Sequence, residues 1–441
     1  MDGISKYQAY DSYKGTGVDW IGHIPENWEM VPIRSIFKFR NEKNDPIKTN
    51  EILSLSIANG VTRYTEEGRG GNKRKDDLKA YKIAHPGDIV LNSMNIIVGA
   101  VGLSKYYGAI SPVYYALFPT RTNINISFFE KIFQNASFQR GLLKFGKGIL
   151  IKLSGTGKLN TIRMKISQDD LKTLYFPLPP LEEQKLISTF LDQRISQIDE
   201  AIAIKEQQIY LLKEHKQITI EKAVTQGINP DAQLKDSGID WIGKIPVHWE
   251  VKRAKYLFCE IDERSNSGQE ELLSVSHVTG VTPRSEKNVN MFMAEDYTGS
   301  KLCRDQDLVI NIMWAWMGAL GVSDRLGIVS PSYGVYRQKI MNTFNPIYLE
   351  NLLKSTKYIE YYNKISTGLH SSRLRFYSHM FFAMKIGFPS FEEQTEIAAY
   401  IKKQIDIIDR VNQHLEKQIT NLKEYKTTLI NSAVTGKIKV V

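Results

Sequence analysis

The chain has 441 residues, a length that allows two or three domains, and its 42% hydrophobic and 24% charged residues exclude a disordered chain. Lysine and arginine outnumber aspartate and glutamate by 58 to 48. The net charge of +10 favours an anionic partner, with nucleic acid as the first candidate, although a basic protein without such a partner has the same balance.

The number of cysteines and the length of the apolar runs indicate the cellular compartment of the protein. Two cysteines, Cys259 and Cys303, argue against a disulfide framework, and no Cys/His cluster predicts a zinc site. The longest apolar run, 308–322, is interrupted by Asn311 and is shorter than the ~20 residues of a membrane-spanning helix. The first residues lack the apolar core of a secretion signal. We therefore expect a soluble, cytoplasmic protein without a membrane partner.

Residues 1–180 are predicted to form a first globular domain. Short apolar patterns at 52–57, 88–91 and 114–118 are separated by Gly, Pro, Asn and Ser, which predicts a mainly β core of short strands. A flanking helix is predicted over 127–145.

A long helix is predicted over 181–226. Its apolar residues alternate in steps of three and four, and no Pro or Gly interrupts them. Gly227 and Pro230 then stop the helix. The stripe includes Leu191, Ile195, Ile198, Ile202, Ile209 and Leu212.

A second domain over 227–390 and a second long helix over 391–436 repeat this order. A flanking helix is expected over 346–363, and Ser390 with Glu393 has the spacing of a capping box. Because exposure of either apolar stripe to water would be unfavourable, we expect the two helices to pack together as a coiled coil. The second stripe comprises Ile401, Ile405, Ile408, Asn412, Leu415, Ile419 and Leu422.

Asn412 occupies the position of Ile202 in the first helix. It fits either a buried asparagine that sets the register of the pair or a residue at the rim of the seam.

The second half of the chain is a copy of the first. The motif Trp-Ile-Gly-x-Ile-Pro begins at Trp20 and again at Trp241, and Asp-x-Val-x-Asn begins at Asp88 and Asp307. A period of about half the chain indicates a duplicated domain. The expected fold is α+β: two similar mainly-β domains joined by two long antiparallel helices, with pseudo-twofold symmetry and neighbouring termini. Shared tryptophans are predicted to be packing anchors: Trp20, Trp28, Trp241 and Trp249.

Positions where the copies differ between shared motifs are candidates for specificity. One such window follows Gly-Val-Thr, and another holds Asn95 in the first copy but Trp314 and Trp316 in the second, where core packing is the prediction for the tryptophans. A basic, Gly- and Ser-rich stretch precedes each long helix and suits phosphate contacts. Each residue also fits an ordinary solvated loop. The candidate DNA-binding residues are Arg63, Arg69, Asn72, Lys73, Arg74, Lys75, Asn95, Lys147, Lys152, Lys158, Arg163, Arg284, Lys287, Asn288, Lys364, Ser371, Arg373 and Arg375.

Catalytic motifs are missing from the sequence. It has no Gly-rich phosphate loop, no nucleophile elbow and no zinc-protease motif. A nuclease-like carboxylate-x-Lys occurs at Glu250–Lys252, but the first copy has Val31 in place of the lysine. A DNA-reading subunit is therefore favoured over a nuclease or a purely structural coiled-coil adaptor.

The combination of motifs resembles the specificity subunit of type I restriction-modification systems. The likeness rests on the two Trp-Ile-Gly-x-Ile-Pro openings, Gly87-Asp88-Ile89-Val90, the Leu-Glu-Glu-Gln helix start at Leu181, and Ala-Val-Thr-Gly at the end of the second helix. The second copy departs from it at Gln306 and Phe391.

The resemblance implies that each domain is a target recognition domain reading one half of a bipartite, asymmetric DNA site. The helices would set the gap and dock two modification subunits, which methylate adenine with S-adenosylmethionine. Two motor-nuclease subunits would use ATP and Mg²⁺. The chain itself would hold no catalytic residue, no metal and no cofactor, and would serve restriction of foreign DNA.

Overall fold

The structure is a computed structural model that describes residues 7–65, 77–149, 163–287, 296–368 and 374–440. The chain forms two compact units, one made of Met1–Lys205 with Glu416–Val441 and one made of Glu206–Leu415. We call them unit 1 and unit 2. Each unit therefore contains one globular domain and one half of each long helix. The domain boundaries predicted from the sequence lie instead at the ends of the long helices.

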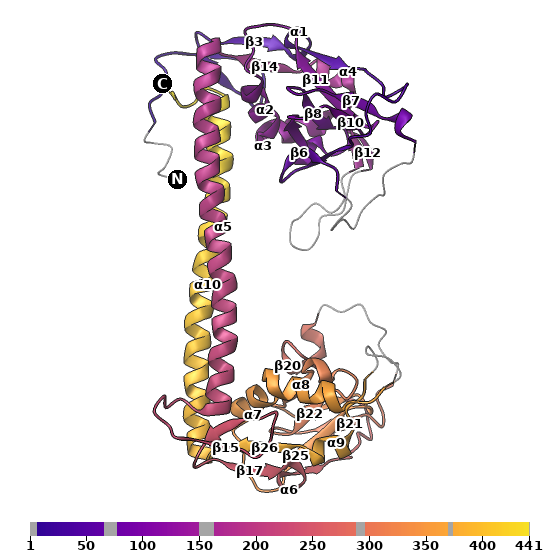
Figure 1. The fold of residues 1–441 in the computed structure, drawn as a ribbon, viewed down its shortest axis with the longest axis vertical. Coiled ribbons are helices and arrows are strands. Elements are labelled where there is room, and N and C mark those ends of the chain that lie inside the picture. The colour runs from indigo at the N-terminus through magenta and orange to yellow at the C-terminus, as the bar shows by residue number, and fades with distance from the viewer. Residues whose placement is uncertain (1–6, 66–76, 150–162, 288–295, 369–373, 441) are drawn as a thin grey trace. The chain divides into compact units, whose positions relative to one another are not determined.

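The globular part of unit 1 is built around a four-stranded antiparallel sheet in the order β4-β11-β8-β9. Figure 1 labels its two central strands, β11 and β8. The four strands are β4 (Phe37–Arg40), β11 (Tyr114–Pro119), β8 (Ile89–Asn92) and β9 (Val101–Leu103). Five two-stranded ribbons surround it: β1 (Tyr13–Gly15) with β2 (His23–Pro25), β3 (Glu29–Pro32) with β14 (Tyr175–Leu178), β5 (Leu53–Ser56) with β6 (Gly60–Arg63), β7 (Lys82–Ala84) with β10 (Gly108–Ile110), and β12 (Lys147–Ile149) with β13 (Arg163–Lys165).

Short helices cover the sheet of unit 1 and close an aromatic core. They are α1 (Ile33–Ile36), η1 (Leu78–Ala80), η2 (Ile96–Val98), α2 (Ile126–Gln134), α3 (Ala136–Gly141), η3 (Leu142–Phe145) and α4 (Gln168–Lys172). The side chains at the centre are Phe37, Phe128, Phe129, Phe133, Phe138 and Phe176, all at most 2% exposed. Their rings meet mostly edge to face, the preferred geometry for aromatic pairs.

Unit 2 has the same plan, with the sheet order β18-β25-β22-β23. Its strands are β15 (Leu234–Asp236), β16 (Lys244–Pro246), β17 (Glu250–Arg253), β18 (Phe258–Glu260), β19 (Leu273–Ser276), β20 (Gly280–Pro283), β21 (Lys301–Cys303), β22 (Leu308–Ile310), β23 (Leu320–Val322), β24 (Gly327–Val329), β25 (Gly334–Gln338) and β26 (Lys385–Phe388). Its short helices are α6 (Ala254–Leu257), η4 (Arg284–Glu286), η5 (Ala315–Met317), α7 (Pro346–Leu353), α8 (Thr356–Ile365) and α9 (Ser378–Ala383).

The single flanking helix expected over 127–145 is wrong, since the chain breaks at Asn135. This residue is extended, and its side-chain oxygen accepts from the backbone N–H groups of Ser137 and Phe138, which starts α3. The second copy breaks at the equivalent residue, Ser355, between α7 and α8, although the Ser355 side chain makes no capping bond. In unit 1, a local capping residue therefore interrupts what the apolar pattern alone presents as one helix.

The two long helices are α5 (Leu181–Gln226) and α10 (Phe391–Val434), which pack together antiparallel (Figure 1). In unit 1 the Lys426 ammonium lies 2.7 Å from Asp199, and in unit 2 the Lys216 ammonium lies 2.8 Å from Asp409. These four residues occupy matching positions in the two copies, so each unit closes its half of the pair with the same ion pair. The α+β class and the coiled coil expected from the sequence are confirmed.

The apolar stripes lie in the seam between the helices. Seven of the apolar residues in the predicted stripes are at most 9% exposed: Leu191, Ile198, Ile202, Ile401, Ile408, Leu415 and Ile419. The other apolar members are half-buried: Ile195, Ile209, Leu212, Ile405 and Leu422. Asn412 is 9% exposed, which places it inside the seam and not at its rim. Its side-chain oxygen has no hydrogen-bond partner within the part of the chain that the structure describes.

The repeated Glu-Glu-Gln motif, at 182–184 and 392–394, attaches each globular domain to the first turn of a long helix. The buried indole of Trp28 donates to Glu183 at 3.0 Å, and that of Trp249 donates to Glu393 at 3.1 Å. The next residue, Gln184, accepts from the N–H of Asn125 and donates to the carbonyl of Pro179. Because Gln394 makes the equivalent bonds in unit 2, the motif acts as a clamp between domain and helix.

The segment after α10 returns to the beginning of the chain within unit 1. The Lys439 N–H donates to the carbonyl of Gln8 at 2.7 Å, and Gly436 lies against Pro25 and Trp28. The expectation that the two terminal regions are neighbours is confirmed by these contacts.

Candidate nucleic-acid interface

A buried carboxylate organises the centre of each sheet. In unit 1, Asp88 is 1% exposed and binds Arg40 of β4 through two bonds of 2.6 and 2.9 Å. In unit 2, Asp307 is 0% exposed and binds Arg337 of β25 through two bonds of 2.8 Å. The position of Arg337 corresponds to Phe118 in unit 1, so the copies supply the same bidentate partner from two different strands.

The strand that follows this aspartate leads into a tight turn at the edge of the sheet. Asn92 and Asn311 end the repeated Asp-x-Val-x-Asn motif, and each side-chain oxygen accepts a backbone N–H two residues further on. The helices η2 and η5 follow, and Gly99 and Gly318 end them with φ of 88° and 80°, a conformation that favours glycine. The same backbone therefore presents different side chains in the two units.

The residue presented in unit 1 is Asn95. It is exposed, and its side chain makes no capping bond to η2. The equivalent residue in unit 2 is Trp314, which is 46% exposed, so the predicted core packing is wrong for this tryptophan. Trp316 is half-buried and stacks on Trp314 with ring centroids 5.9 Å apart.

Four candidate cations of unit 2 fall on described residues. Lys364 and Arg375 are exposed. Arg284, the first residue of η4, and Lys287, which follows η4, are half-buried. Burial lowers the pKa of Lys287, and repulsion by Arg284 and Lys354 lowers it further. An anion that approached these side chains, such as a phosphate, would reduce the repulsion between them.

Unit 1 has a comparable basic cluster, part of which sequence reasoning missed. Lys147 is exposed at the start of β12 and pairs with Lys165 in the ribbon register. Burial lowers the pKa of Lys82, as does repulsion by Lys165. The sequence pattern does not indicate Lys82 and Lys165 as candidate DNA-binding residues, because they are far apart along the chain and only the fold brings their charges together.

Arg63 is already engaged on the surface of unit 1. Its guanidinium lies 3.1 Å from Glu51 and 5.2 Å from the ring centre of Tyr106. Both partners of the ion pair are well exposed, so the interaction is weak and a phosphate could replace it.

The remaining candidates cannot be placed in this interface. Arg163 belongs to β13, but its side chain is not described. The following lie outside the described residues: Arg69, Asn72, Lys73, Arg74, Lys75, Lys152, Lys158, Asn288, Ser371 and Arg373.

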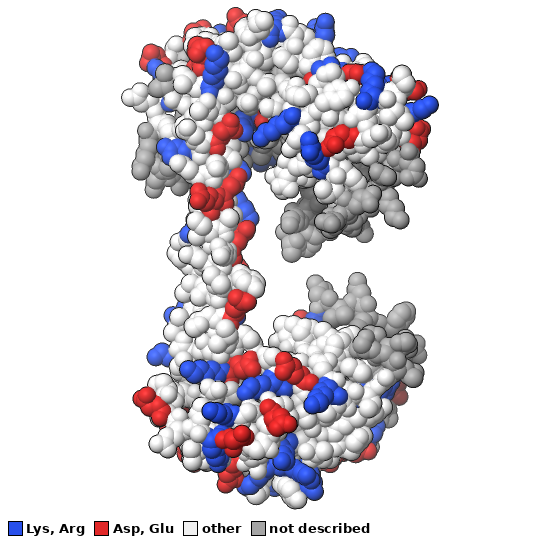
Figure 2. Space-filling model, viewed as in Figure 1, with Lys and Arg blue, Asp and Glu red and all other residues white. Residues whose placement is uncertain are grey.

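No group of three His, Cys, Asp or Glu residues among the described residues could hold a metal ion. Figure 2 shows basic and acidic side chains interspersed on the visible face of each unit. Over the described ranges, no helix is both long and apolar enough to cross a bilayer.

The sequence and the fold both match known proteins. Residues 25–214 match the family model described as type I restriction modification DNA specificity domain. Two curated relatives from Methanocaldococcus jannaschii are each 25% identical: the putative type I restriction enzyme MjaX specificity subunit (95% of this chain, 96% of the relative) and the MjaVIII specificity subunit (95% and 94%).

Two solved structures share the fold over nearly the whole chain. One, from a study of assembly and conformational transition of the type I R-M system, has a TM-score of 0.65 at 14% identity and covers 93% of this chain and 98% of its own. The HsdS subunit from Thermoanaerobacter tengcongensis has a TM-score of 0.54 at 13% identity, with 94% and 98% covered. Together with the duplicated domains and the paired helices, these matches show that the chain is similar over nearly its whole length to specificity subunits of type I restriction-modification systems.

Proposed function

We propose that each globular domain reads one half of a bipartite, asymmetric site in double-stranded DNA, and that the helix pair sets the gap between the halves. The observation that carries this proposal is the duplicated clamp. Trp28 with Glu183 and Trp249 with Glu393 attach each domain rigidly to the beginning of a long helix. If each recognition domain is fixed to a stiff helix pair, the two domains contact the DNA at a defined spacing and with a defined rotation about its axis.

The length of the helices suits this role. At ~1.5 Å per residue, the 46 residues of α5 span about 69 Å. DNA repeats every 34–36 Å, or about 10–10.5 base pairs, so a rod of this length is comparable to two helical turns.

The helix pair also offers side chains to protein partners. Tyr210, Leu211 and Ile218 of α5 and Ile407 and Val411 of α10 are 38 to 64% exposed within unit 2. Apolar side chains at this density on a two-helix rod favour a docked partner. We propose that two modification subunits dock along the helices and supply adenine methylation with S-adenosylmethionine, and that two motor-nuclease subunits add ATP- and Mg²⁺-dependent cleavage. The chain itself then needs no cofactor and works in the cytoplasm.

The nuclease alternative has little support from the geometry. Glu250 and Lys252 form an ion pair with each other on the exposed strand β17. Both side chains are about half exposed, as in an ordinary surface pair. Incubation of the purified chain with Mg²⁺ and plasmid DNA should leave the plasmid intact, and cleavage without any partner subunit would overturn the recognition role.

Shortening both helices tests the spacing role. Deleting residues 203–206 and 413–416, which match in the two copies, removes about 6 Å and rotates each helix end by about 40°. The rotation corresponds to about one base pair and the rise to about two. We expect the gap in the methylated site to shorten by one or two base pairs while both half-sites stay the same.

Methylation mapping in cells that also express the modification subunit reads both half-sites and the gap. The matched control replaces the exposed residues of the same segments by alanine, which keeps the helix length and should keep the gap. An unchanged gap in the deletion variant, or new half-site sequences, would refute the spacing role.

A further inference from the structure

The η5 turn of unit 2 carries an exposed apolar surface that the fold does not use. We define the η5 tip as Trp314, Trp316 and Met317. Trp314 is 46% exposed and Met317 is 36% exposed. A large aromatic side chain that is kept in water on a binding protein is typical of a contact surface.

The η5 tip is rigid before any partner arrives. The rings of Trp314 and Trp316 stack with an interplanar angle of 21°. The Trp316 indole donates to the carbonyl of Met313 at 2.9 Å, and the Asn363 side chain of α8 donates to the carbonyl of Trp316 at 2.8 Å. Because Trp314 stacks on Trp316, whose position these hydrogen bonds fix, binding of a partner to Trp314 would cost little side-chain conformational entropy.

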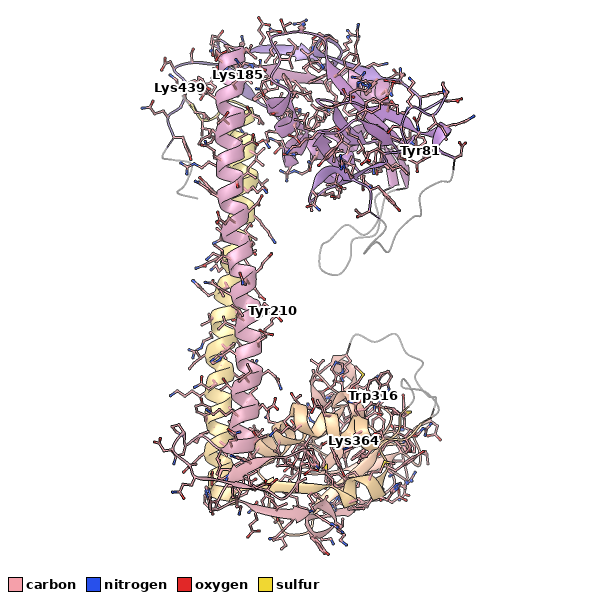
Figure 3. The ribbon with its side chains drawn as sticks, viewed as in Figure 1. Tyr81, Lys185, Tyr210, Trp316, Lys364 and Lys439 are labelled. Carbon is pink, nitrogen blue, oxygen red and sulfur yellow. The ribbon has the colours of Figure 1, made fainter. Side chains whose placement is uncertain are left out.

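Two exposed cations flank the η5 tip. Lys364 follows Asn363, whose side chain holds the tip, and Figure 3 shows Trp316 and Lys364 at the same side of unit 2. Arg375 precedes Phe376, whose N–H donates to the carbonyl of Ile312 at 2.9 Å, two residues before Trp314. Within the described ranges, neither cation forms an ion pair with a carboxylate. The tip is therefore an apolar surface beside two positive charges that have no carboxylate partner among the described residues.

Unit 1 repeats the cations but changes the tip. Lys144 and Lys165 occupy the positions of Lys364 and Arg375, and both are exposed. The bond from Phe376 also recurs, since the Ile166 N–H donates to the carbonyl of Ser93 at 3.0 Å. In contrast, Asn95 replaces Trp314. Contacts to phosphates do not depend on the DNA sequence, whereas contacts to bases do. The cations that both units share therefore fit contacts to the DNA backbone, and the residue that differs between the units fits the recognition of different bases.

We propose that the η5 tip is a base-reading element of the second recognition domain, with Trp314 in contact with an apolar surface of a target base and Lys364 and Arg375 on the neighbouring phosphates. This inference rests on the proposed reading of DNA by each domain. The apolar surface is either the methyl group of a thymine in the major groove or the face of an unstacked base.

The test compares four variants in DNA binding with the modification subunit present, after methylation mapping of the wild type has identified both half-sites. Trp314→Ala should lower the affinity for the target site about 10-fold and leave the salt dependence unchanged. Lys364→Ala and Arg375→Ala should each reduce the salt slope by about one. Tyr256→Ala is the matched control because Tyr256 is a 64% exposed aromatic on α6 of the same unit, and it should bind like the wild type.

Thymine replaced by deoxyuracil in the target half-site distinguishes the two base surfaces. If Trp314 contacts the methyl group, the wild type loses affinity for this DNA and Trp314→Ala does not. If the ring stacks on an unstacked base, Trp314→Ala still loses affinity and Trp314→Phe retains most of it, while deoxyuracil has no effect.

Wild-type affinity and an unchanged methylation pattern in Trp314→Ala would overturn the proposal. Failure of the underlying function looks different, since the wild type would then show no bipartite specificity at all. Because Trp314 is largely outside the core, the melting temperature of Trp314→Ala should equal that of the Tyr256→Ala control.

Discussion

Removal of the Arg40 guanidinium should destabilise the domain of unit 1 by about 3 kcal/mol. Arg40→Ile leaves the carboxylate of Asp88, which is 1% exposed, with the His85 N–H at 2.8 Å as its remaining charge-stabilising donor in the described residues. Breaking a buried ion pair from one side costs about 3–5 kcal/mol, and the lower end applies here because the Arg40 side chain is 21% exposed. The contact of the guanidinium with the Phe118 ring, at 4.7 Å, is lost as well.

Hydrogen exchange followed by mass spectrometry measures this loss separately for each domain. A change of 3 kcal/mol should accelerate exchange of the β8 and β11 amides about 100-fold, since each 1.4 kcal/mol is a factor of ten. The amides of β22 and β25 in unit 2 serve as an internal control and should not change.

The second copy suggests a rescue. In unit 2, Ile261 stands at the position of Arg40, and Arg337 stands at the position of Phe118. The double variant Arg40→Ile with Phe118→Arg therefore rebuilds the arrangement of unit 2 around Asp88. We expect its exchange to return to within about 10-fold of the wild type. Unchanged exchange in Arg40→Ile, or a double variant no better than the single one, would refute the reasoning.

Three further outcomes are expected. Glu393→Ala leaves a buried indole N–H without its acceptor and should lower the stability of unit 2 by about 1–3 kcal/mol in denaturant unfolding, while Glu392→Ala, at an exposed neighbour, should not; equal losses would contradict the clamp. Asn412→Ile removes a buried oxygen that lacks a partner in the described residues and should slow hydrogen exchange in the middle of α10; faster exchange would argue against this account. Burial raises the pKa of the Cys303 thiol to about 11, so at pH 8 iodoacetamide should label the half-buried Cys259 and spare Cys303, and labelling of both would show that the core opens.

The sequence by itself determined the features that depend on local pattern and on the comparison of the two copies. The stripes from Leu191 to Leu212 and from Ile401 to Leu422 predicted the paired helices, because an apolar stripe on helices of 46 and 44 residues has to be buried. The duplication likewise predicted two domains of the same plan, since a repeated motif such as Asp-x-Val-x-Asn repeats its backbone turn.

Only the tertiary structure decided which side chains remain at the surface and which charges meet. Trp314 is a large apolar side chain of the kind that usually lies in a core, yet it is 46% exposed at the start of η5. The buried aspartate receives its arginine from β4 in one copy and from β25 in the other, and no local pattern could assign those partners. Lys82 and Lys165 form one cluster for the same reason: electrostatic contacts depend on distance in space, and that distance is set by strand order and not by separation along the chain.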